Sequence, residues 1–347
     1  MRTVVLACAA IALVRSNGVY EINARNGNRK VYWNVPTFQC DPHGLNFTTL
    51  AKKYGITQNR GDRFRGEHFA ILYDPGDFPA LLEKHGELVR RNGGIPQLGN
   101  LTLHLQLFGK IVEKLIPEET FSGLGVIDFE SWRPIFRQNF GALKPYKDLS
   151  IKHVKQMHPF WPEQWVEKEA RQQFEDKAKL FMRDTLILAK SLRPKATWGY
   201  YAYPYCFNMN PNTQNANCPK EVEPENNQLK WFFELEDAFY PSVYLSSKLT
   251  AGNKVQLIEG RIKEANRVKK FIRKDKEIYL YYWYKYHDTK EFLTKEDVFN
   301  TITALGASNI NGLILWGSSG DVNSKQACLN LYKYVDKILG PILVNFM

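Results

Sequence analysis

The amino-acid sequence predicts an α/β fold with one domain, a closed barrel of parallel β/α units over residues 31–347. Seven short runs rich in β-branched and aromatic residues alternate with helical patterns along the 347-residue chain. Alternation of this kind is typical of parallel sheets with crossover helices. No linker or change of composition divides the chain near its middle. We therefore expect one closed sheet rather than two domains.

The residues before the barrel predict secretion. Residues 1–18 begin with one arginine and continue as an apolar run too short to span a bilayer, which is the pattern of a signal peptide. We expect cleavage near residues 16–19 and a loose or processed arm over 19–30. No later segment is apolar enough for a transmembrane helix, so no membrane insertion is expected. Sequons at Asn46 and Asn100 are candidate glycosylation sites.

The strands and helices are expected in regular alternation. The strand patterns cover 31–35, 68–73, 124–127, 197–203, 242–245, 278–283 and 312–316. The helical patterns cover 45–54, 100–115, 162–192, 227–236, 254–272, 295–305 and 324–339. Apolar residues recur at steps of three and four in the helical patterns, whereas glycine, proline or polar residues bound most of the strands.

Four cysteines remain once the signal peptide is removed, and an oxidising compartment favours their pairing. Three pairings are possible. The loop between Cys206 and Cys218 is short and rich in Asn and Pro, which favours a local disulfide. Cys40 would then bond Cys328 across the whole fold, and loop-closure models assign more stabilisation to such long loops.

The net charge of +11 suits a polyanionic partner, namely nucleic acid, acidic polysaccharide or an anionic membrane. Ordinary solubility would explain the same charge. The basic residues over 261–273 are better interpreted as a solvated helix face than as a substrate track. The sequence contains no metal-ligand cluster and no phosphate-binding loop. A nuclease is therefore disfavoured, no nucleic-acid partner is expected, and neither a metal nor a cofactor is predicted.

Two acids follow the third strand pattern. Asp128 and Glu130 are separated by one aromatic residue, and residues i and i+2 of a strand point to one face, about 6.5–7 Å apart. In β/α barrels the active site lies at the carboxyl ends of the strands. Two carboxyls held close cannot both ionise easily, so one pKa rises and favours acid/base catalysis. The alternative is a capping role where a strand meets a helix.

Aromatic side chains stand at the other strand ends. They are Tyr73, Tyr201, Tyr203, Tyr244, Trp283 and Trp316. Carboxyls ringed by tyrosine and tryptophan are typical of a sugar-binding cleft, although a strand aromatic taken alone is more often a core residue. Arg133 would either clamp a substrate carboxylate or pair with a neighbouring acid. We take Tyr73 and Arg133 as candidate substrate-binding residues.

The acid pair favours an unusual route for glycoside hydrolysis. Most glycosidases place two carboxyls on opposite sides of the scissile bond, whereas Asp128 and Glu130 come from one strand end. Substrate assistance resolves this, because the N-acetyl carbonyl of an amino sugar can attack its own anomeric carbon. Glu130 would then act as general acid and later as base, while Asp128 would stabilise the acetamido group.

Five segments in order carry a family resemblance. They are VYWNVP (31–36), GVIDFESWRP (125–134), GYYAYPYC (199–206), PSVY (241–244) and LWGSS (315–319). Together they resemble the animal-type hyaluronidases of glycoside hydrolase family 56, in particular the insect venom enzymes, over about residues 31–344. The resemblance implies a distorted seven-stranded TIM-like barrel. It also implies retaining, substrate-assisted cleavage of β-1,4 bonds after N-acetylglucosamine in hyaluronan and, secondarily, in chondroitin.

The resemblance also implies roles for particular residues. Glu130 would be the catalytic acid and Asp128 the acid that orients the acetamide, with Tyr201 and Tyr244 supporting that group and Trp316 forming the floor. The disulfides of the family fall on the two cysteine pairs favoured above. An alternative function is an inactive hyaluronan-binding homologue, such as a lectin-like venom allergen. The intact acids argue against this alternative.

Overall fold

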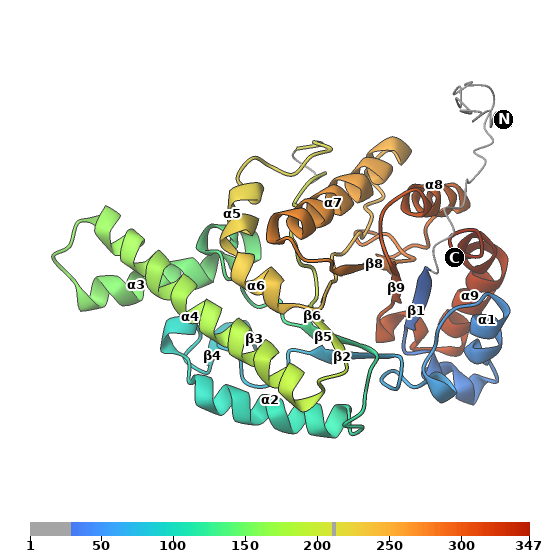
Figure 1. Ribbon diagram of the computed structural model, residues 1–347, viewed down its shortest axis with the longest axis horizontal. Helices are drawn as coiled ribbons and strands as arrows, with labels where there is room; N and C mark the ends of the chain where they lie inside the picture. The colour runs from blue at the N-terminus through green and yellow to red at the C-terminus, as the bar shows by residue number, and fades with distance from the viewer. Residues whose placement is uncertain (1–28, 210–212) are drawn as a thin grey trace, which may run out of the picture.

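The computed structural model describes residues 29–209 and 213–347. The expected signal peptide (1–18), its cleavage point and residues 19–28 of the expected arm lie outside the described residues. Helices surround a core of strands, and a pair of long helices extends from one side of the body (Figure 1). No helix within the described ranges has the length and apolar character that crossing a bilayer requires.

Seven parallel strands form the core of the described chain. They are β1 (Lys30–Asn34), β2 (Phe69–Tyr73), β5 (Leu124–Asp128), β6 (Thr197–Tyr200), β7 (Ala238–Phe239), β8 (Glu277–Trp283) and β9 (Gly312–Trp316). One ladder has the order β1-β9-β8-β7 and the other the order β2-β5-β6. A parallel bridge between Tyr201 and Tyr240 joins the two ladders just beyond β6 and β7. The predicted α/β class with parallel strands is confirmed.

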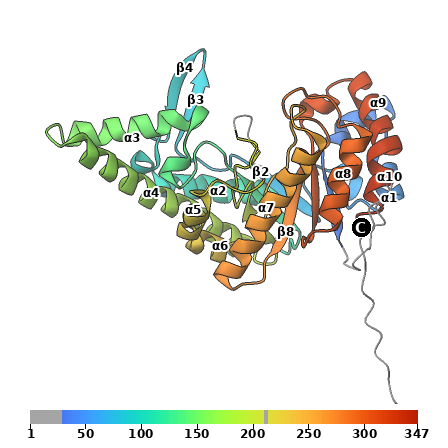
Figure 2. The ribbon, with the colours of Figure 1, turned by 90° about the horizontal axis from the view of Figure 1, so that it is seen from above.

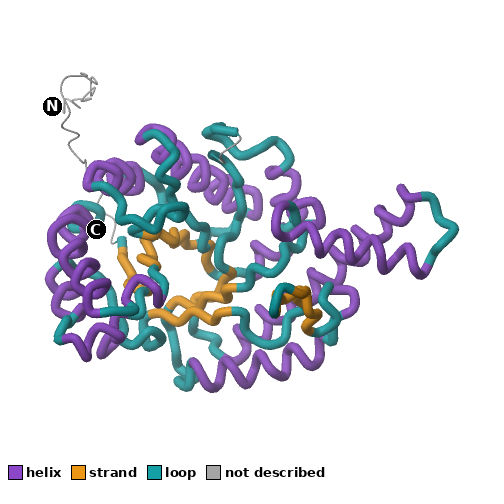
Figure 3. Tube along the Cα trace, turned by 180° about the vertical axis from the view of Figure 1, so that it is seen from behind, coloured by secondary structure: helices purple, strands orange, loops and turns teal. Residues whose placement is uncertain are grey.

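The helices lie outside the strands, which form an arc within them (Figure 3). They are α1 (Phe47–Lys53), α2 (Leu101–Leu115), α3 (Lys144–Met157), α4 (Glu163–Leu192), α5 (Val222–Gln228), α6 (Lys230–Leu235), α7 (Ala251–Ile272), α8 (Lys295–Gly306), α9 (Lys325–Tyr334) and α10 (Gly340–Leu343). Several begin where a side-chain oxygen accepts a backbone N–H of the first turn. The capping residues are Asn46, Asn100, Thr250, Thr294 and Ser324.

The period-two alternation of the strands divides the core into two layers. One set of side chains faces inward from different strands and forms a compact inner cluster. Its members include Tyr32, Ile71, Val126, Tyr281 and Ile314. The alternate residues of the same strands belong to the larger cluster between the strands and the helices. Each strand is therefore buried on both faces, as a parallel sheet requires.

The fifth strand prediction is wrong in position. The strand β7 covers Ala238–Phe239, whereas the predicted segment 242–245 contributes only an isolated bridge from Ser242 to Tyr281. Pro241 separates the two pieces, and proline has no N–H for a ladder. The helical pattern 227–236 also differs, because it divides into α5 and α6 at Leu229.

Two elements were not predicted from the sequence. A hairpin of β3 (Ala80–Lys84) and β4 (Glu87–Arg91) follows β2, and Figure 2 shows it standing beside α3. The backbone N–H of Leu81 donates to the Tyr146 hydroxyl at 2.9 Å, which fixes the hairpin to α3. Helix α3 itself is rich in lysine and buries only Tyr146, Ser150 and Val154, so its sequence shows little apolar periodicity.

The structure contains two disulfides, and both are the pairs that the resemblance implies. Cys40, which follows β1, bonds Cys328 in α9 across 288 residues. Cys206 and Cys218 close a local loop beyond β6. The first bond ties the beginning of the fold to its last helices, and the second restrains a loop at the same end of the strands as the two acids.

Candidate active site

The two acids lie where β5 leaves the sheet. Asp128 is the last residue of β5 and pairs in register with Tyr73 of β2. Asp128 is half-buried, Phe129 is buried and Glu130 is exposed. Phe129 stacks on Phe78 with ring centroids 3.9 Å apart. The buried aromatic between the two acids therefore anchors the chain, while the carboxyls lie on the open side.

The surroundings of Asp128 and Glu130 favour the protonated form of their carboxyls. Burial raises the pKa of Asp128 to about 8, and the negative charges of Glu130 and Asp74 contribute to this rise. The Glu130 side chain reaches solvent, but the protein atoms around its carboxyl desolvate it in part and raise its pKa, while the Arg133 guanidinium opposes this shift. Two carboxyls in one desolvated space share a proton more readily than they both ionise. The pair can therefore hold a proton at neutral pH and donate it.

Tyr201 and Tyr244 lie beside the acids. The Tyr201 ring is 4.9 Å from the Tyr281 ring and 6.4 Å from the Tyr244 ring, between centroids. Burial raises the pKa of Tyr201, and the charges of Glu130 and Asp128 add to this effect. Burial likewise raises the pKa of Tyr244. Both phenols therefore remain protonated and can donate hydrogen bonds to a bound ligand.

Two tryptophans and Tyr244 form an aromatic wall. The Trp316 ring stacks on Tyr244 at 5.7 Å and meets Trp283 edge-on at 5.0 Å, between centroids. The indole Nε1 of Trp316 donates to the Tyr73 hydroxyl oxygen at 2.9 Å. This bond joins the end of β9 to the end of β2, although no ladder within the described residues connects β1 to β2. Burial raises the pKa of Tyr73 to about 12, so its hydroxyl stays neutral.

Arg133 has different neighbours from those considered in the sequence. Its guanidinium carbon lies over the rings of Tyr205 at 4.7 Å, Phe207 at 5.0 Å and Phe140 at 5.3 Å from the centroids. Its Nη1 donates to the Gln138 carbonyl at 2.7 Å. In the described part of the chain it makes no ion pair with a carboxylate. Its charge nevertheless acts on the neighbouring Glu130, whose pKa it lowers.

A cavity of about 560 Å³ adjoins Tyr244. Basic side chains from three segments contribute to its lining. They are Lys248, Arg261 and His287. Sequence reasoning assigned 261–273 to a solvated face, and this was wrong for Arg261. Its Nη1 donates to the Ser242 carbonyl at 2.5 Å, and burial lowers its pKa to about 10, which leaves it charged at neutral pH.

A signal for Arg261 was present in the sequence. Arg261 follows the buried Leu257 by four residues, so it lies on the buried stripe of α7. Lys254, one turn before Leu257, is buried for the same reason. A basic residue that falls on an apolar stripe predicts a buried partner or a cavity rather than a solvated face.

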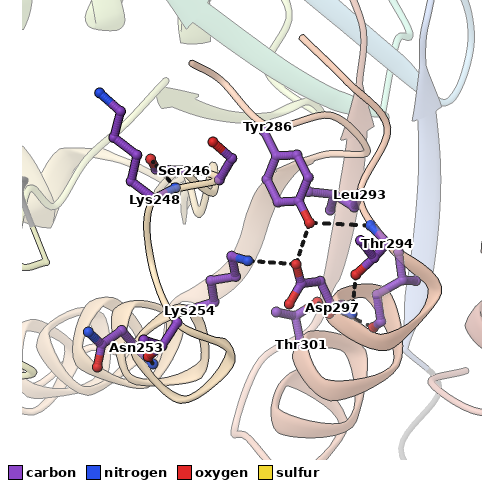
Figure 4. A network of polar contacts seen from close by, with 12 residues as sticks. Ser246, Lys248, Asn253, Lys254, Tyr286, Leu293, Thr294, Asp297 and Thr301 are labelled. Carbon is purple, nitrogen blue, oxygen red and sulfur yellow. Dashed lines mark hydrogen bonds and ion pairs between the residues drawn. The ribbon is translucent and has the colours of Figure 1, made fainter. Parts of the chain in front are cut away.

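The partner of Lys254 lies on the next helix. Its Nζ donates to a carboxylate oxygen of Asp297 at 2.6 Å, and the Tyr286 hydroxyl donates to the same oxygen (Figure 4). The backbone N–H of Thr294 donates in turn to the Tyr286 hydroxyl at 3.3 Å. This buried network joins α7 to α8.

No group of three or more His, Cys, Asp or Glu side chains suited to a metal ion occurs within 29–209 and 213–347. The acid pair, the tyrosines and the aromatic wall lie together at the strand ends. Such a set can bind a sugar ring on its aromatic faces and supply one proton beside it.

Known proteins share this sequence and fold. The family model described as hyaluronidase matches residues 24–347. The hyaluronidase of Apis mellifera is 52% identical over 314 residues, covering 90% of this chain and 82% of that protein. The hyaluronidase of Vespa magnifica is 47% identical over 317 residues, covering 91% and 88%. The crystal structure of bee venom hyaluronidase in complex with a hyaluronic acid tetramer superimposes with a TM-score of 0.88 at 51% identity, covering 91% and 98%.

Proposed function

Because the chain belongs to the hyaluronidase family, glycoside hydrolase family 56, we propose that it hydrolyses hyaluronan. The observation that carries the proposal is the pair Asp128 and Glu130, half-buried and exposed respectively, with raised pKa values at the aromatic end of the strands. A similar solved enzyme, from bee venom, holds a hyaluronic acid tetramer. The same acidic repeat with a different amino sugar makes chondroitin a secondary substrate.

The proposed reaction uses the substrate's own acetamide. Glu130 donates its proton to the glycosidic oxygen while the carbonyl oxygen of the N-acetyl group attacks the anomeric carbon. The glycosidic C–O bond breaks, the leaving sugar departs as an alcohol, and a cyclic oxazolinium remains. Glu130, now a carboxylate, removes a proton from water, and that water opens the ring at the anomeric carbon. Two displacements at one carbon retain its configuration. In this step the proton that the pair shares lies on Glu130, so Asp128 is a carboxylate that accepts a hydrogen bond from the acetamide N–H and stabilises its positive charge.

The surrounding aromatics support the same step. The protonated phenols of Tyr201 and Tyr244 are hydrogen-bond donors of the kind that holds the acetamide oxygen in the attacking position. The Trp316 face, fixed by its bond to Tyr73, offers an apolar floor for the methyl group of the acetamide. Correct orientation matters because the attack requires the oxygen close to the anomeric carbon.

An acidic polymer also suits the cavity beside Tyr244. Lys248, Arg261 and His287 line it together with apolar residues. A guanidinium that is charged and partly desolvated binds a carboxylate strongly. We therefore place glucuronate carboxylates of the substrate in or near this cavity, and Arg133 remains a candidate for contacting the same polymer.

We infer secretion from the signal-like amino terminus and from the two disulfides, which persist in oxidising compartments. Asn46 and Asn100 are proposed glycosylation sites. Both are exposed helix caps whose Oδ1 accepts a backbone N–H, from Thr49 and Leu103 respectively. The amide nitrogen, to which a glycan is attached, remains available in each.

We also infer that residues 31–347 form one domain whose strands close into a distorted barrel. Side chains from both ladders meet in the inner cluster, for instance Tyr32 of β1 and Ile71 of β2. The bridge Tyr201–Tyr240 joins the ladders on one side. On the other side the Trp316–Tyr73 hydrogen bond spans the gap.

The test is release of reducing N-acetylglucosamine ends from hyaluronan by the purified protein and by Glu130→Gln. We expect Glu130→Gln to lose at least about 10²–10⁴-fold in turnover, the usual contribution of general acid catalysis, and to retain hyaluronan binding. Glu113→Gln, an exposed change on α2, is the matched control and should be fully active. A folded wild type that binds hyaluronan without cleaving it would favour the lectin-like alternative.

A further inference from the structure

The β3–β4 hairpin brings a cation to the acid end of β5. Arg91, the last residue of β4, donates from Nη1 to Asp74 Oδ2 at 2.5 Å and from Nη2 to Asp74 Oδ1 at 2.8 Å. Its Nε donates to the Phe78 carbonyl at 2.8 Å. The Arg91 side chain is 21% exposed and that of Asp74 is 43% exposed. This is a bidentate pair at the rim of the cleft.

Asp74 connects this ion pair to the catalytic strand. It directly follows β2, and its backbone N–H donates to the Asp128 carbonyl at 2.7 Å. Its φ of +42° places it in the left-handed region, which a non-glycine residue rarely adopts. Side-chain contacts must hold such a conformation, and the Arg91 fork supplies two of them. The position of Asp74 therefore fixes the end of β5.

The rest of the loop after β2 is held equally tightly. The Asp77 N–H donates to Nδ1 of the buried His104 at 3.0 Å, and Asn92, next to Arg91, donates to the Asp77 carbonyl at 2.5 Å. The Trp132 indole donates to the Pro79 carbonyl at 2.8 Å. The loop is thus held by hydrogen bonds both to the hairpin and to the segment that follows the acids.

We propose that Arg91 is a positioning residue for the acid pair: through Asp74 it holds the end of β5 in place and cancels the charge of Asp74 beside Asp128. The inference rests on the proposed function of that pair. Arg91 makes no contact with Glu130 or Asp128 in the structure and is not a catalytic residue. Within the described residues, the cation that pairs with Asp74 is Arg91.

The charge effect has a definite sign. The groups that face Asp128 electrostatically are Glu130 and Asp74, together with several phenols. The phenols are Tyr73, Tyr201, Tyr205, Tyr244 and Tyr281. The Arg133 guanidinium faces Glu130, and Asp77 and Tyr146 face Arg91 besides Asp74. Removing the charge of Arg91 leaves Asp74 uncompensated, which raises the pKa of the pair. Removing the charge of Asp74 leaves Arg91 with Asp77, whose Oδ1 lies 3.8 Å from the Arg91 Nε; the net charge beside the pair becomes more positive, which lowers the pKa of the pair.

The experiment is a charge cycle of Arg91→Gln, Asp74→Asn and the double variant, with Arg91→Lys as the conservative variant and the exposed Arg90→Gln as control. We measure kcat and KM on hyaluronan against pH. In the plot of kcat against pH, activity falls on the alkaline side as the acid pair loses its proton, and we call this fall the alkaline limb. For Arg91→Gln we expect the alkaline limb to move to higher pH by on the order of 0.5 pH unit. We also expect kcat to be lowered about 10-fold. Asp74→Asn should shift the limb down, and the double variant should restore it. Arg91→Lys should keep the limb, because its charge remains.

NMR titration of ¹³C-labelled carboxyl carbons measures the pKa values of Asp128 and Glu130 directly and does not depend on enzyme activity. A wild type that does not cleave hyaluronan refutes the proposed function, whereas the NMR shifts still test Arg91. Unchanged limbs and carboxyl titrations in both Arg91→Gln and Asp74→Asn overturn the inference. The inference is also overturned if Arg91→Gln lowers kcat without moving the alkaline limb and the double variant does not recover kcat. General loosening of the hairpin would explain that result. If Arg91→Gln fails to fold, Asp74→Asn alone decides through its downward shift.

Discussion

Keeping Asp128 protonated has a cost for stability that can be measured. Its pKa rises from 3.8 to about 8 in the folded protein. The folded state therefore binds more protons than the unfolded chain between these two values, so stability falls as pH rises through that window. The amide of the variant Asp128→Asn does not titrate. This variant should therefore gain stability over the wild type as pH rises from about 4 to about 8, and the gain should level off above that.

The magnitude follows from the size of the shift. One pKa unit corresponds to about 1.36 kcal/mol, so the rise from 3.8 towards pH 7 gives an upper limit of about 4 kcal/mol. The cleft opens to water at Asp128, and solvent screening reduces this several-fold. We expect ~1–2 kcal/mol at pH 7, or on the order of 2–4 °C in melting temperature for a chain of this size.

The assay is thermal unfolding of the wild type and of Asp128→Asn at pH 4, 5.5, 7 and 8, with both disulfides intact. Changes in packing or hydrogen bonding caused by the amide contribute an offset that does not depend on pH, so only the growth of the difference is diagnostic. Glu113→Gln on α2 controls for loss of a carboxylate as such. A difference between wild type and Asp128→Asn that stays constant from pH 4 to 8 would refute the assignment of a raised pKa to Asp128.

Three further predictions concern other parts of the molecule. Tyr201→Phe keeps the ring but removes the hydroxyl donor, so kcat on hyaluronan should fall about 10²-fold with little change in KM; an unchanged kcat would exclude this hydroxyl from the reaction. Lys254→Met leaves Asp297 buried without its cation and should cost about 3–5 kcal/mol in denaturant unfolding, whereas a loss below about 1 kcal/mol would contradict the contribution of the network. Removing the Cys40–Cys328 bond, which spans 288 residues, should destabilise the protein by about 6 kcal/mol, against about 3 kcal/mol for the other disulfide, which spans 12; an equal loss from both would reject the loop-length argument.

The sequence was most informative where one local pattern determines both structure and chemistry. The apolar run of β5 predicts a buried strand, and the acids at 128 and 130 fall at its carboxyl end by simple alternation. The tyrosines and Trp316 were found in the same way, because parallel strands end on one side. A residue can be predicted to lie at a strand end without knowing which strands are its neighbours.

Features that depend on contacts between distant segments could not be found in this way. The strand β7 has two residues, too few for a pattern, and Pro241 displaces the more obvious apolar segment. The hairpin β3–β4 is largely exposed along β4 and at the end of β3, so neither strand shows the apolar alternation of a half-buried strand. The pairing of Arg91 with Asp74 depends on the return of that hairpin to the end of β2, and nothing in either residue's sequence neighbours indicates it.

The placement of positive charge reconciles two requirements of the proposed reaction. A polyanionic substrate must be attracted by cations, but a cation beside the acids would lower their pKa and remove the proton that catalysis needs. Arg133 is the cation that lowers the pKa of Glu130, and burial more than offsets it. Arg91 is neutralised by Asp74, and Arg261 lies in the cavity beside Tyr244, where the phenols rather than the two acids act on its pKa. The charge that attracts the polymer is thus separated from the carboxyls that cleave it, so one cleft can bind an anion and still hold a proton.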